Sequence, residues 1–183
     1  GFEMVRVEPT YDYKQRVKLL VTNNTMDALG ELIKARKKEI CVFINSTDTI
    51  HRVIEGLELQ DRCKVFCSDK SVKKLRERGF KQAYQELQEL ADINFFTSRF
   101  YSAVDIELEY KPTVVFIDGL LDIVNDYNDQ TECSEIIREL MAVSTAMNMS
   151  MWCVLHENPM TDKLVGSLGS IAERKVTEVF IIR

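Results

Sequence analysis

The sequence predicts an α/β fold in which a mainly parallel β-sheet lies between two layers of helices. Short, continuous runs of β-branched and aromatic residues recur along the chain, a pattern typical of strands buried on both faces of a parallel sheet. Stretches with helical periodicity separate these runs, and such alternation implies right-handed crossovers and a three-layer sandwich. The 183 residues fit one domain, residues 1–183.

Six runs are predicted to form central strands, because each is mostly apolar and ends in polar residues. They are residues 40–44, 64–67, 93–96, 113–117, 151–155 and 179–182. Residues 4–7 alternate in polarity, which predicts an edge strand instead.

Three regions between the runs have the period of a helix. Apolar residues recur at i, i+3, i+4 and i+7 over residues 50–57, and at i, i+4, i+7 and i+11 over residues 136–147. Both patterns predict a helix with one apolar stripe that faces the core. Residues 72–90 predict a pair of helices, or one helix disturbed near Gly79.

Composition and charge exclude several classes of protein. With 24 basic and 29 acidic side chains the net charge is −5, so the chain is not a polycation. No apolar run approaches the roughly 18 residues of a membrane helix, and no membrane partner is expected. No secretion signal opens the chain, and the 5 cysteines form no Cys-x-x-Cys pair. We therefore expect buried, reduced thiols in a cytoplasmic protein.

Polar residues follow five of the predicted strands, at the point where each strand ends. Ligands of such sheets bind outside the carboxyl ends of the strands, which predicts a functional site at this edge. The alternative is that the polar residues only cap the next helices, and we favour it for the first two segments. The segments are residues 45–47, 68–69, 97–99, 118–119 and 156–158.

Asp118 carries the most specific signal. An apolar strand followed by Asp and Gly is typical of the Walker B element of nucleotide triphosphatases, in which the carboxylate holds Mg²⁺. We therefore predict that Asp118 is a catalytic residue and a Mg²⁺ ligand. Asp122, Asp126 and Asp129 either add to this metal site or solvate the start of the next helix.

The sequence lacks a standard triphosphate cradle. A P-loop needs a Gly-Lys step, because backbone N–H groups surround the phosphates while the Lys reaches the outer ones. None of the 7 glycines is followed by Lys, and the Gly/Ser-rich loop predicted at residues 166–170 precedes no such step. We therefore do not expect the chain to hydrolyse ATP by itself.

The first part of the chain contains two segments that resemble helicase motifs. Residues 41–47 are similar to the motif IV strand and turn, and residues 97–106 to motif V, with Ala103 where that motif usually has Gly. On these grounds residues 4–106 resemble the second RecA-like domain of superfamily-two helicases of phages and mobile elements. The arginine-rich motif VI that should follow is missing.

The second part of the chain resembles a different RecA-like protein. Residues 114–119, 154–158 and 166–170 are similar to the Walker B strand, the next strand with its polar sensor residue, and a loop that approaches DNA or a neighbouring subunit. Residues 110–183 thus resemble the C-terminal half of RecA/RepA-like ATPases of mobile elements. A seam near residues 106–113 separates the two blocks, and a natural fusion, a degenerate remnant or a constructed chimera would each produce it.

The resemblances imply roles for residues at the predicted edge. Thr97 and Arg99 would face nucleic acid, and Asp105 and Asn158 would lie beside a nucleotide. His156, as a catalytic residue, or Asn158 would sense the phosphate or the attacking water. The alternative for His156 is that it only hydrogen-bonds a loop at the end of its strand. The implied partners are DNA, or another RecA-like subunit that supplies the missing P-loop.

A basic stretch is a further candidate for contact with DNA. Residues 64–81 contain seven basic and two acidic residues, a local charge of +5. Lys73, Lys74 and Arg76 could follow a phosphate backbone, although we favour a solvated helix face. Residues 105–135 carry nine acidic residues and one basic residue, −8, and would repel nucleic acid unless Mg²⁺ intervened.

Together these observations predict a RecA-like, P-loop NTPase-like sheet in a module related to DNA-processing proteins of mobile elements. Mg²⁺ and a nucleotide are its candidate ligands. Two alternatives stay open. One is a purely structural or chimeric α/β domain without a ligand, and the other is a Mg²⁺-dependent phosphoryl-transfer enzyme that uses Asp118 and Asp122.

Overall fold

The computed structural model describes residues 17–22, 24–35, 39–100, 112–155, 166–176 and 178–181. The strands in these ranges are β1 (Val17–Val21), β2 (Ile40–Phe43), β3 (Cys63–Phe66), β4 (Ala83–Tyr84), β5 (Ile93–Phe96), β6 (Val114–Ile117), β7 (Ser150–Leu155) and β8 (Glu178–Ile181). The helices are α1 (Thr25–Ala35), α2 (Thr47–Gly56), α3 (Asp69–Glu77), α4 (Gln130–Met147) and α5 (Gly166–Lys175). Two short 3₁₀ turns, η1 (Ser98–Phe100) and η2 (Leu120–Ile123), follow β5 and β6.

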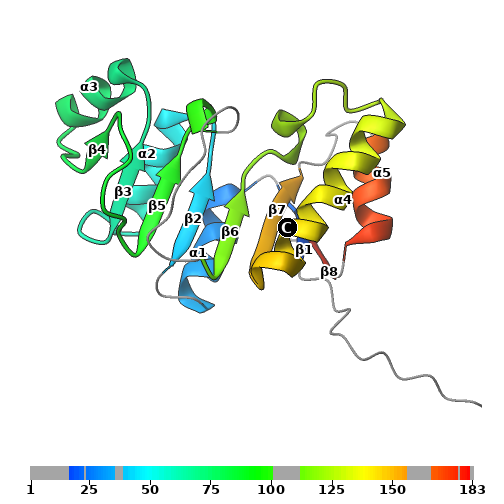
Figure 1. The fold of residues 1–183 in the computed structure, drawn as a ribbon. Coiled ribbons are helices and arrows are strands. Elements are labelled where there is room, and N and C mark those ends of the chain that lie inside the picture. The colour runs from blue at the N-terminus through cyan, green and yellow to red at the C-terminus, as the bar shows by residue number, and fades with distance from the viewer. Residues whose placement is uncertain are drawn as a thin grey trace, which may run out of the picture.

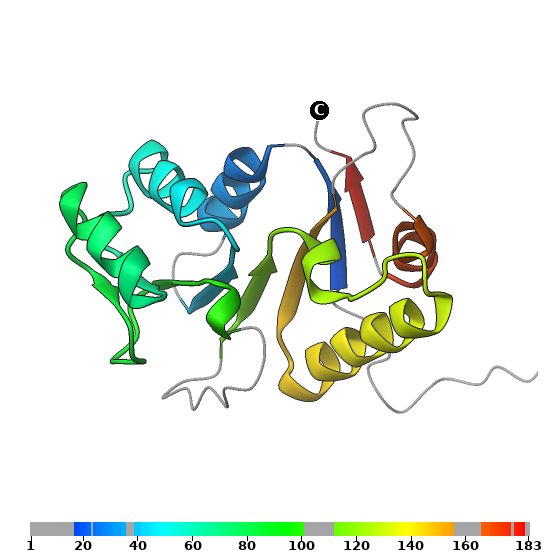
Figure 2. The same ribbon diagram turned by 90° about the horizontal axis from the view of Figure 1, so that it is seen from above.

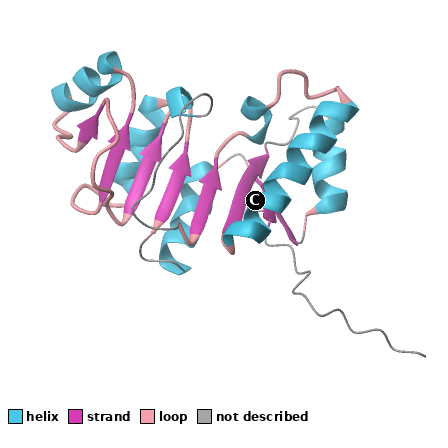
Figure 3. Cartoon of the chain, in the orientation of Figure 1, coloured by secondary structure: helices cyan, strands magenta, loops and turns pink. Residues whose placement is uncertain are grey.

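The strands form one sheet in the order β4-β3-β5-β2-β6-β7-β1-β8, and each pair of neighbours is parallel (Figure 1). Helices α1, α2 and α3 pack on one face, and α4 and α5 pack on the other (Figure 2). The cartoon coloured by secondary structure shows the strands pointing the same way between these helices (Figure 3). The predicted three-layer α/β sandwich with a parallel, RecA-like sheet is confirmed.

The two blocks of sequence on either side of residues 106–113 contribute interleaved strands to this sheet. Strand β1 of the first block lies between β7 and β8 of the second, with Leu19 opposite both Cys153 and Val179. Strand β2 of the first block pairs with β6 of the second, with Val42 opposite Phe116. Each block therefore depends on the other for strand pairing.

The central strands are buried on both faces, which explains their continuous apolar sequences. In β2, Ile40 and Val42 point toward the layer of α1, α2 and α3, whereas Cys41 and Phe43 point toward the opposite layer. Successive side chains of a strand alternate between faces, so both sets must be apolar when both faces are covered. The six predicted central strands correspond to β2, β3, β5, β6, β7 and β8.

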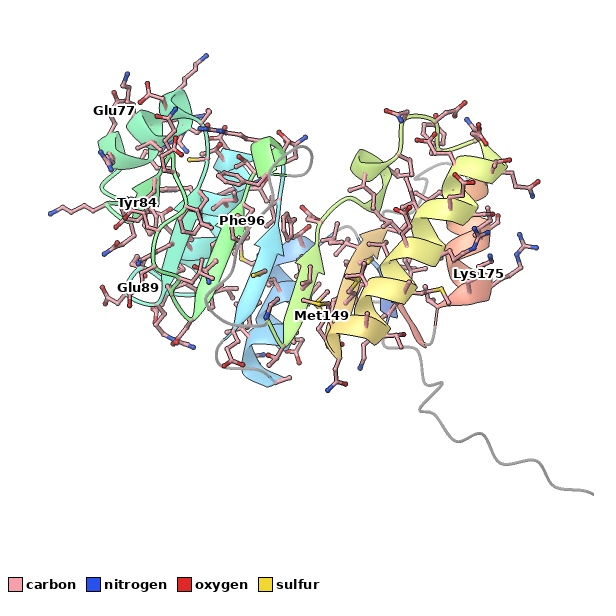
Figure 4. All side chains as sticks on the ribbon, in the orientation of Figure 1. Glu77, Tyr84, Glu89, Phe96, Met149 and Lys175 are labelled. Atoms are coloured by element: carbon pink, nitrogen blue, oxygen red, sulfur yellow. The ribbon has the colours of Figure 1, made fainter. Side chains whose placement is uncertain are left out.

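An aromatic cluster fills the second face near β2, β3 and β5. Phe96 lies between Phe43 and Phe66 with both ring-centroid distances at 5.2 Å, and Phe100 meets Phe96 edge-on at 5.6 Å. Figure 4 labels Phe96 on β5 and, on the same face, Met149 next to the start of β7. Such aromatic pairs contribute about 0.5–1.5 kcal/mol each beyond the burial of their area.

The helix predicted for the second half of residues 72–90 is wrong. Ala83 and Tyr84 form β4 at the edge of the sheet, and the residues that follow form turns before β5. The Lys64 ammonium lies over the Tyr84 ring and donates a hydrogen bond to the Glu89 carbonyl, so these contacts hold the segment against β3. Strand pairing has overridden the local helical period.

The loop predicted at residues 166–170 is also wrong, because these residues form the first half of α5. Leu168, Ile171 and Ala172 are buried against the sheet, and this burial outweighs the low helix propensity of two glycines. Gly166 has a φ of +62°, a left-handed conformation that glycine adopts without strain.

The α4 helix exists as predicted but presents a different face to the core. Its buried residues are Cys133, Ile137 and Ser144, whereas Val143 and Met147 of the predicted stripe are 44% and 37% exposed. The Ser144 hydroxyl donates a hydrogen bond of 2.8 Å to the backbone carbonyl of Met149, which satisfies a polar group in the buried position. The edge strand predicted at residues 4–7 lies outside the described residues.

Gly166→Ala tests the entry into α5. An added Cβ would lie 2.7 Å from both the carbonyl oxygen and the ring of Tyr127, in a backbone conformation unfavourable for alanine. We expect the free energy of unfolding to fall by about 2–4 kcal/mol, from the left-handed backbone plus the clash. Gly79→Ala is the control, because Gly79 also has a positive φ but no described atom within 4 Å of its added Cβ. Equal losses in urea unfolding would contradict this account of the clash.

Candidate functional site

The carboxyl ends of the strands lie level along one edge of the sheet, which we call the carboxyl edge. The backbone N–H of Asp118 donates to the carbonyl of Phe43 at 2.9 Å, and that of Ile44 donates to the carbonyl of Phe96 at 3.0 Å. These bonds keep the ends of β6, β2 and β5 in register. The described strand-end segments predicted from the sequence all lie at this edge, namely residues 45–47, 68–69, 97–99 and 118–119.

Two of these polar segments cap helices. The Ser46 hydroxyl accepts a hydrogen bond from the backbone N–H of Thr49 at 3.2 Å, at the start of α2. The Ser68 hydroxyl does the same for Ser71 at 3.4 Å, at the start of α3. Residues 45–47 and 68–69 therefore do provide the helix caps that we expected of them.

The connections that leave β2 and β6 diverge at the carboxyl edge. Strand β2 leads into α2 on one face, whereas β6 leads into η2 and α4 on the other. Neighbouring parallel strands whose connections part in this way open a crevice between them. A cavity of about 270 Å³ occupies this place, and its lining includes Asn45, Ser46, Asp118, Gly119 and Leu155.

A turn that follows β1 reaches the same carboxylate from the other side. The Thr25 hydroxyl, on the first residue of α1, donates a hydrogen bond of 2.6 Å to Oδ1 of Asp118. Ninety-three positions separate the two residues in the sequence. A hydrogen bond to a carboxylate is stronger than one between neutral groups, and the start of a helix favours negative charge. Asp118 is therefore fixed where two strand–helix units meet.

Asp118 also borders a second cavity, of about 320 Å³, between the start of α1 and the first turns of α2. Asn24, Thr25, Thr49 and Arg52 are among its lining residues. Larger cavities of about 400 and 510 Å³ lie beside α3 and beneath α4, but none of the residues lining them is a predicted site residue. Asp118 thus borders two small cavities at the carboxyl edge.

The oxygen atoms at Asp118 suit a Mg²⁺ ion that is also bound by phosphate. They do not form a site in which protein atoms supply all the ligands. Mg²⁺ usually takes one or two carboxylates, with phosphate oxygens and waters completing its shell. Asp118 and Thr25 offer one carboxylate and one hydroxyl oxygen. Within the described ranges, no group of three or more His, Cys, Asp or Glu side chains could hold a metal ion.

The acidic residues after Asp118 serve the start of α4. The Asp129 carboxylate accepts hydrogen bonds from the backbone N–H groups of Thr131 and Glu132, at 2.8 and 3.1 Å. Asp126 accepts one from the N–H of Asn128 at 2.8 Å. These bonds agree with solvation of a helix start. The side chain of Asp122 lies outside the described part of the structure.

Thr97 and Arg99 lie at the end of β5, two strands away from β6. Neighbouring strands are about 4.8 Å apart, which places the Thr97 backbone about 10 Å from that of Asp118. Thr97 is only 7% exposed. The Arg99 guanidinium lies over the Phe100 ring and 3.6 Å from the Glu86 carboxylate.

The predicted basic residues of α3 have partners within the protein. The Lys73 ammonium lies 2.7 Å from the Asp69 carboxylate, and that of Lys74 lies 2.7 Å from the Asp48 carboxylate. The Arg76 guanidinium donates a hydrogen bond to a backbone carbonyl of β4 at 2.9 Å. Helix α3 packs beside β3 and β4, three or more strands from β6. This basic surface is therefore separate from the Asp118 cavities.

The Asp48 carboxylate connects α2 to α3, because it accepts hydrogen bonds from Lys74 and Arg78 at 2.7 and 2.6 Å. These bonds, from Lys74 first and then Arg78, lower the pKa of Asp48 below its ordinary value. The carboxylate therefore stabilises the fold above about pH 4, and this contribution is lost as the pH falls through the lowered pKa.

We expect Asp48→Asn to lower the urea midpoint slightly at pH 7 and to approach the wild-type midpoint near pH 3. The effect is small because both partners are exposed and salt screens them. Asp61→Asn, an equal change of charge at an exposed position, is the control. A midpoint difference that stayed constant from pH 7 to pH 3 would contradict the assignment.

Three predicted site residues, Asp105, His156 and Asn158, lie outside the described residues, so their roles stay predictions. The sequence interpretation missed Thr25 and the strand that positions it. Lys18 interrupts the apolar run of β1, and its ammonium lies over the Trp152 ring with a distance of 5.1 Å to the centroid. The available signal was a polar, cap-like cluster between the apolar residues 17–21 and the start of α1.

The five cysteines are free and buried, as predicted. Burial raises the pKa of the Cys41, Cys63 and Cys153 thiols to about 12, which suppresses the reactive thiolate. None of the helices in the described ranges is both long and apolar enough to cross a membrane.

No protein-family model matches the chain, and no curated protein matches its sequence. The geometry of the site is therefore the basis for assigning a function.

Proposed function

We propose that the chain is a RecA-like module related to nucleotide triphosphatases of DNA-processing, mobile-element origin. In this proposal it keeps the metal-holding part of a nucleotide site and lacks the phosphate-holding part, so it is not an autonomous ATPase. The observation that carries the proposal is the hydrogen bond from Thr25 to Asp118, which joins the turn after β1 to the end of β6.

This pair has the chemistry that P-loop enzymes use to hold Mg²⁺. In those enzymes a Ser or Thr hydroxyl at the start of a helix and a Walker B carboxylate at the end of a strand both face the metal. Thr25 begins α1 and Asp118 follows β6. Bound Mg²⁺ would supply neutralisation of phosphate charge at this point. Asp118 would hold the ion, and Thr25 would orient the carboxylate.

The same turn explains why a phosphate cradle is missing. A P-loop places seven residues, from its first Gly to its Lys, before the Ser or Thr, and their N–H groups surround the phosphates. Only three residues separate the end of β1 at Val21 from Thr25, and none of them is Gly or Lys. So short a turn cannot surround a triphosphate. In the proposal, a second RecA-like subunit supplies the missing loop, or a nucleotide binds weakly.

DNA is the other partner in this proposal, and the observations support it less strongly. Thr97 is buried, and Lys73 and Lys74 form ion pairs. Arg99 and Arg76 also contact groups within the protein. His156 and Asn158 keep their proposed role as sensors of phosphate or water.

Isothermal titration with Mg²⁺–ATP tests the proposed function. We expect weak binding with no turnover, and a loss of affinity of about tenfold or more in Asp118→Asn, because the neutral amide is a poorer Mg²⁺ ligand. Asp126→Asn is the matched control, since this exposed carboxylate accepts its hydrogen bond from Asn128 of its own turn and lines neither cavity as described.

The other outcomes identify the alternatives. Sustained ATP turnover by the isolated chain, abolished in Asp118→Asn, would contradict the absence of a working cradle. Mg²⁺ binding without nucleotide binding would favour the phosphoryl-transfer enzyme. Binding of neither ligand would favour the structural domain.

A further inference from the structure

Arg52 supplies a positive charge to the cavity between α1 and α2. Of the described residues that line the two cavities at Asp118, Arg52 alone is basic. It lies on α2, one turn after Thr49, and its Nη2 donates a hydrogen bond to the Thr49 hydroxyl at 3.4 Å. The guanidinium is thus directed along α2 toward the carboxyl edge, the direction that long helical side chains usually take.

Arg52 differs from the other cations near it. Lys74 and Arg78 contact the Asp48 carboxylate, and Lys73 contacts Asp69. Within the described part of the chain, Arg52 contacts a hydroxyl and no carboxylate. Among these described residues its charge therefore has no acidic partner within ion-pair distance, although it borders a cavity that Asp118 also lines.

Close packing of α1 on α2 holds in place the side of the cavity that contains Arg52. Met26, which also lines the cavity, rests on Gly56, where an added Cβ would lie only 2.8 Å from the Met26 sulfur. Val53, the next residue of the wall, is buried. This packing fixes the distance between the start of α1 and the Arg52 turn of α2.

We propose that Arg52 holds a phosphoryl oxygen of the ligand whose Mg²⁺ ion is held at Asp118. The cavity combines a guanidinium, the start of an eleven-residue helix and a carboxylate. A bare phosphate would be attracted by the first two and repelled by the third. A Mg²⁺–phosphate pair satisfies all three, because the cation faces Asp118 and the anion faces Arg52.

The ligand class is therefore a Mg²⁺ complex of a phosphorylated compound, such as a nucleoside di- or triphosphate. This step rests on the proposed function for the position of the metal. The inference goes beyond the proposed function because it assigns the phosphate to α2 and not to the turn after β1. Arg52 would take the place of the cation that a P-loop lysine supplies.

Binding of Mg²⁺–ADP to three variants tests the inference. We expect affinity to fall about tenfold in Arg52→Gln, which removes the charge at similar size. Arg52→Lys should lose less, since it keeps the charge without the planar fork. Arg174→Gln is the control, because this exposed arginine of α5 likewise donates a hydrogen bond within its own helix, to the Ser170 carbonyl. Wild-type affinity in Arg52→Gln would overturn the inference.

Mn²⁺ binding, followed by the broadening of NMR signals, separates this inference from the proposed function. Mn²⁺ accepts the same oxygen ligands as Mg²⁺, so its binding reads the Asp118 site without phosphate. Mn²⁺ binding that depends on Asp118, with no ADP binding, would overturn the role of Arg52 and leave the metal site intact. ADP binding that depends on Arg52 but not on Asp118 would support the phosphate contact and overturn the proposed metal site.

Discussion

The parallel pairing of β1 between β7 and β8 is the constraint on which the candidate site depends. Strand β1 comes from the start of the described chain, whereas β7 and β8 come from its end. In the sheet β1 lies between them, with Leu19 opposite both Cys153 and Val179. Strand β1 then ends level with β7, where the Thr22 N–H donates to the Leu155 carbonyl at 3.3 Å. Without this pairing, the start of α1 would have no fixed position relative to β6.

As a result, residues of two different helices lie around the Asp118 carboxylate. Helix α1 brings Thr25 to Asp118, while α2 brings Arg52 to the same cavity. The two helices pack closely at Gly56, and the hydroxyl, the carboxylate and the guanidinium all line one cavity. This arrangement, together with the short turn after β1, is the basis of the proposed shared or weakened nucleotide site.

The sequence predicted the elements whose signal is local and missed those decided by tertiary pairing. Strand β6 and Asp118 were predictable because a strand buried on both faces must be apolar throughout. Strand β1 was not predictable, because Lys18 interrupts its apolar run. The Lys18 ammonium lies over the Trp152 ring, a contact that the sequence does not reveal. Likewise, the burial of Leu168 and Ile171 makes a helix of a glycine-containing segment. Arg52 looked like any exposed residue of α2, since its cavity exists only after α1 has packed.

The most direct test of the central claim is a double-mutant cycle between Thr25→Val and Asp118→Ala, measured by urea unfolding. The two side chains share a hydrogen bond of 2.6 Å across 93 positions of sequence. The account predicts a coupling energy of about 1–3 kcal/mol, as expected for a partly buried hydrogen bond to a charged group. Free-energy changes that simply add, within about 0.3 kcal/mol, would contradict the contact and the site built on it.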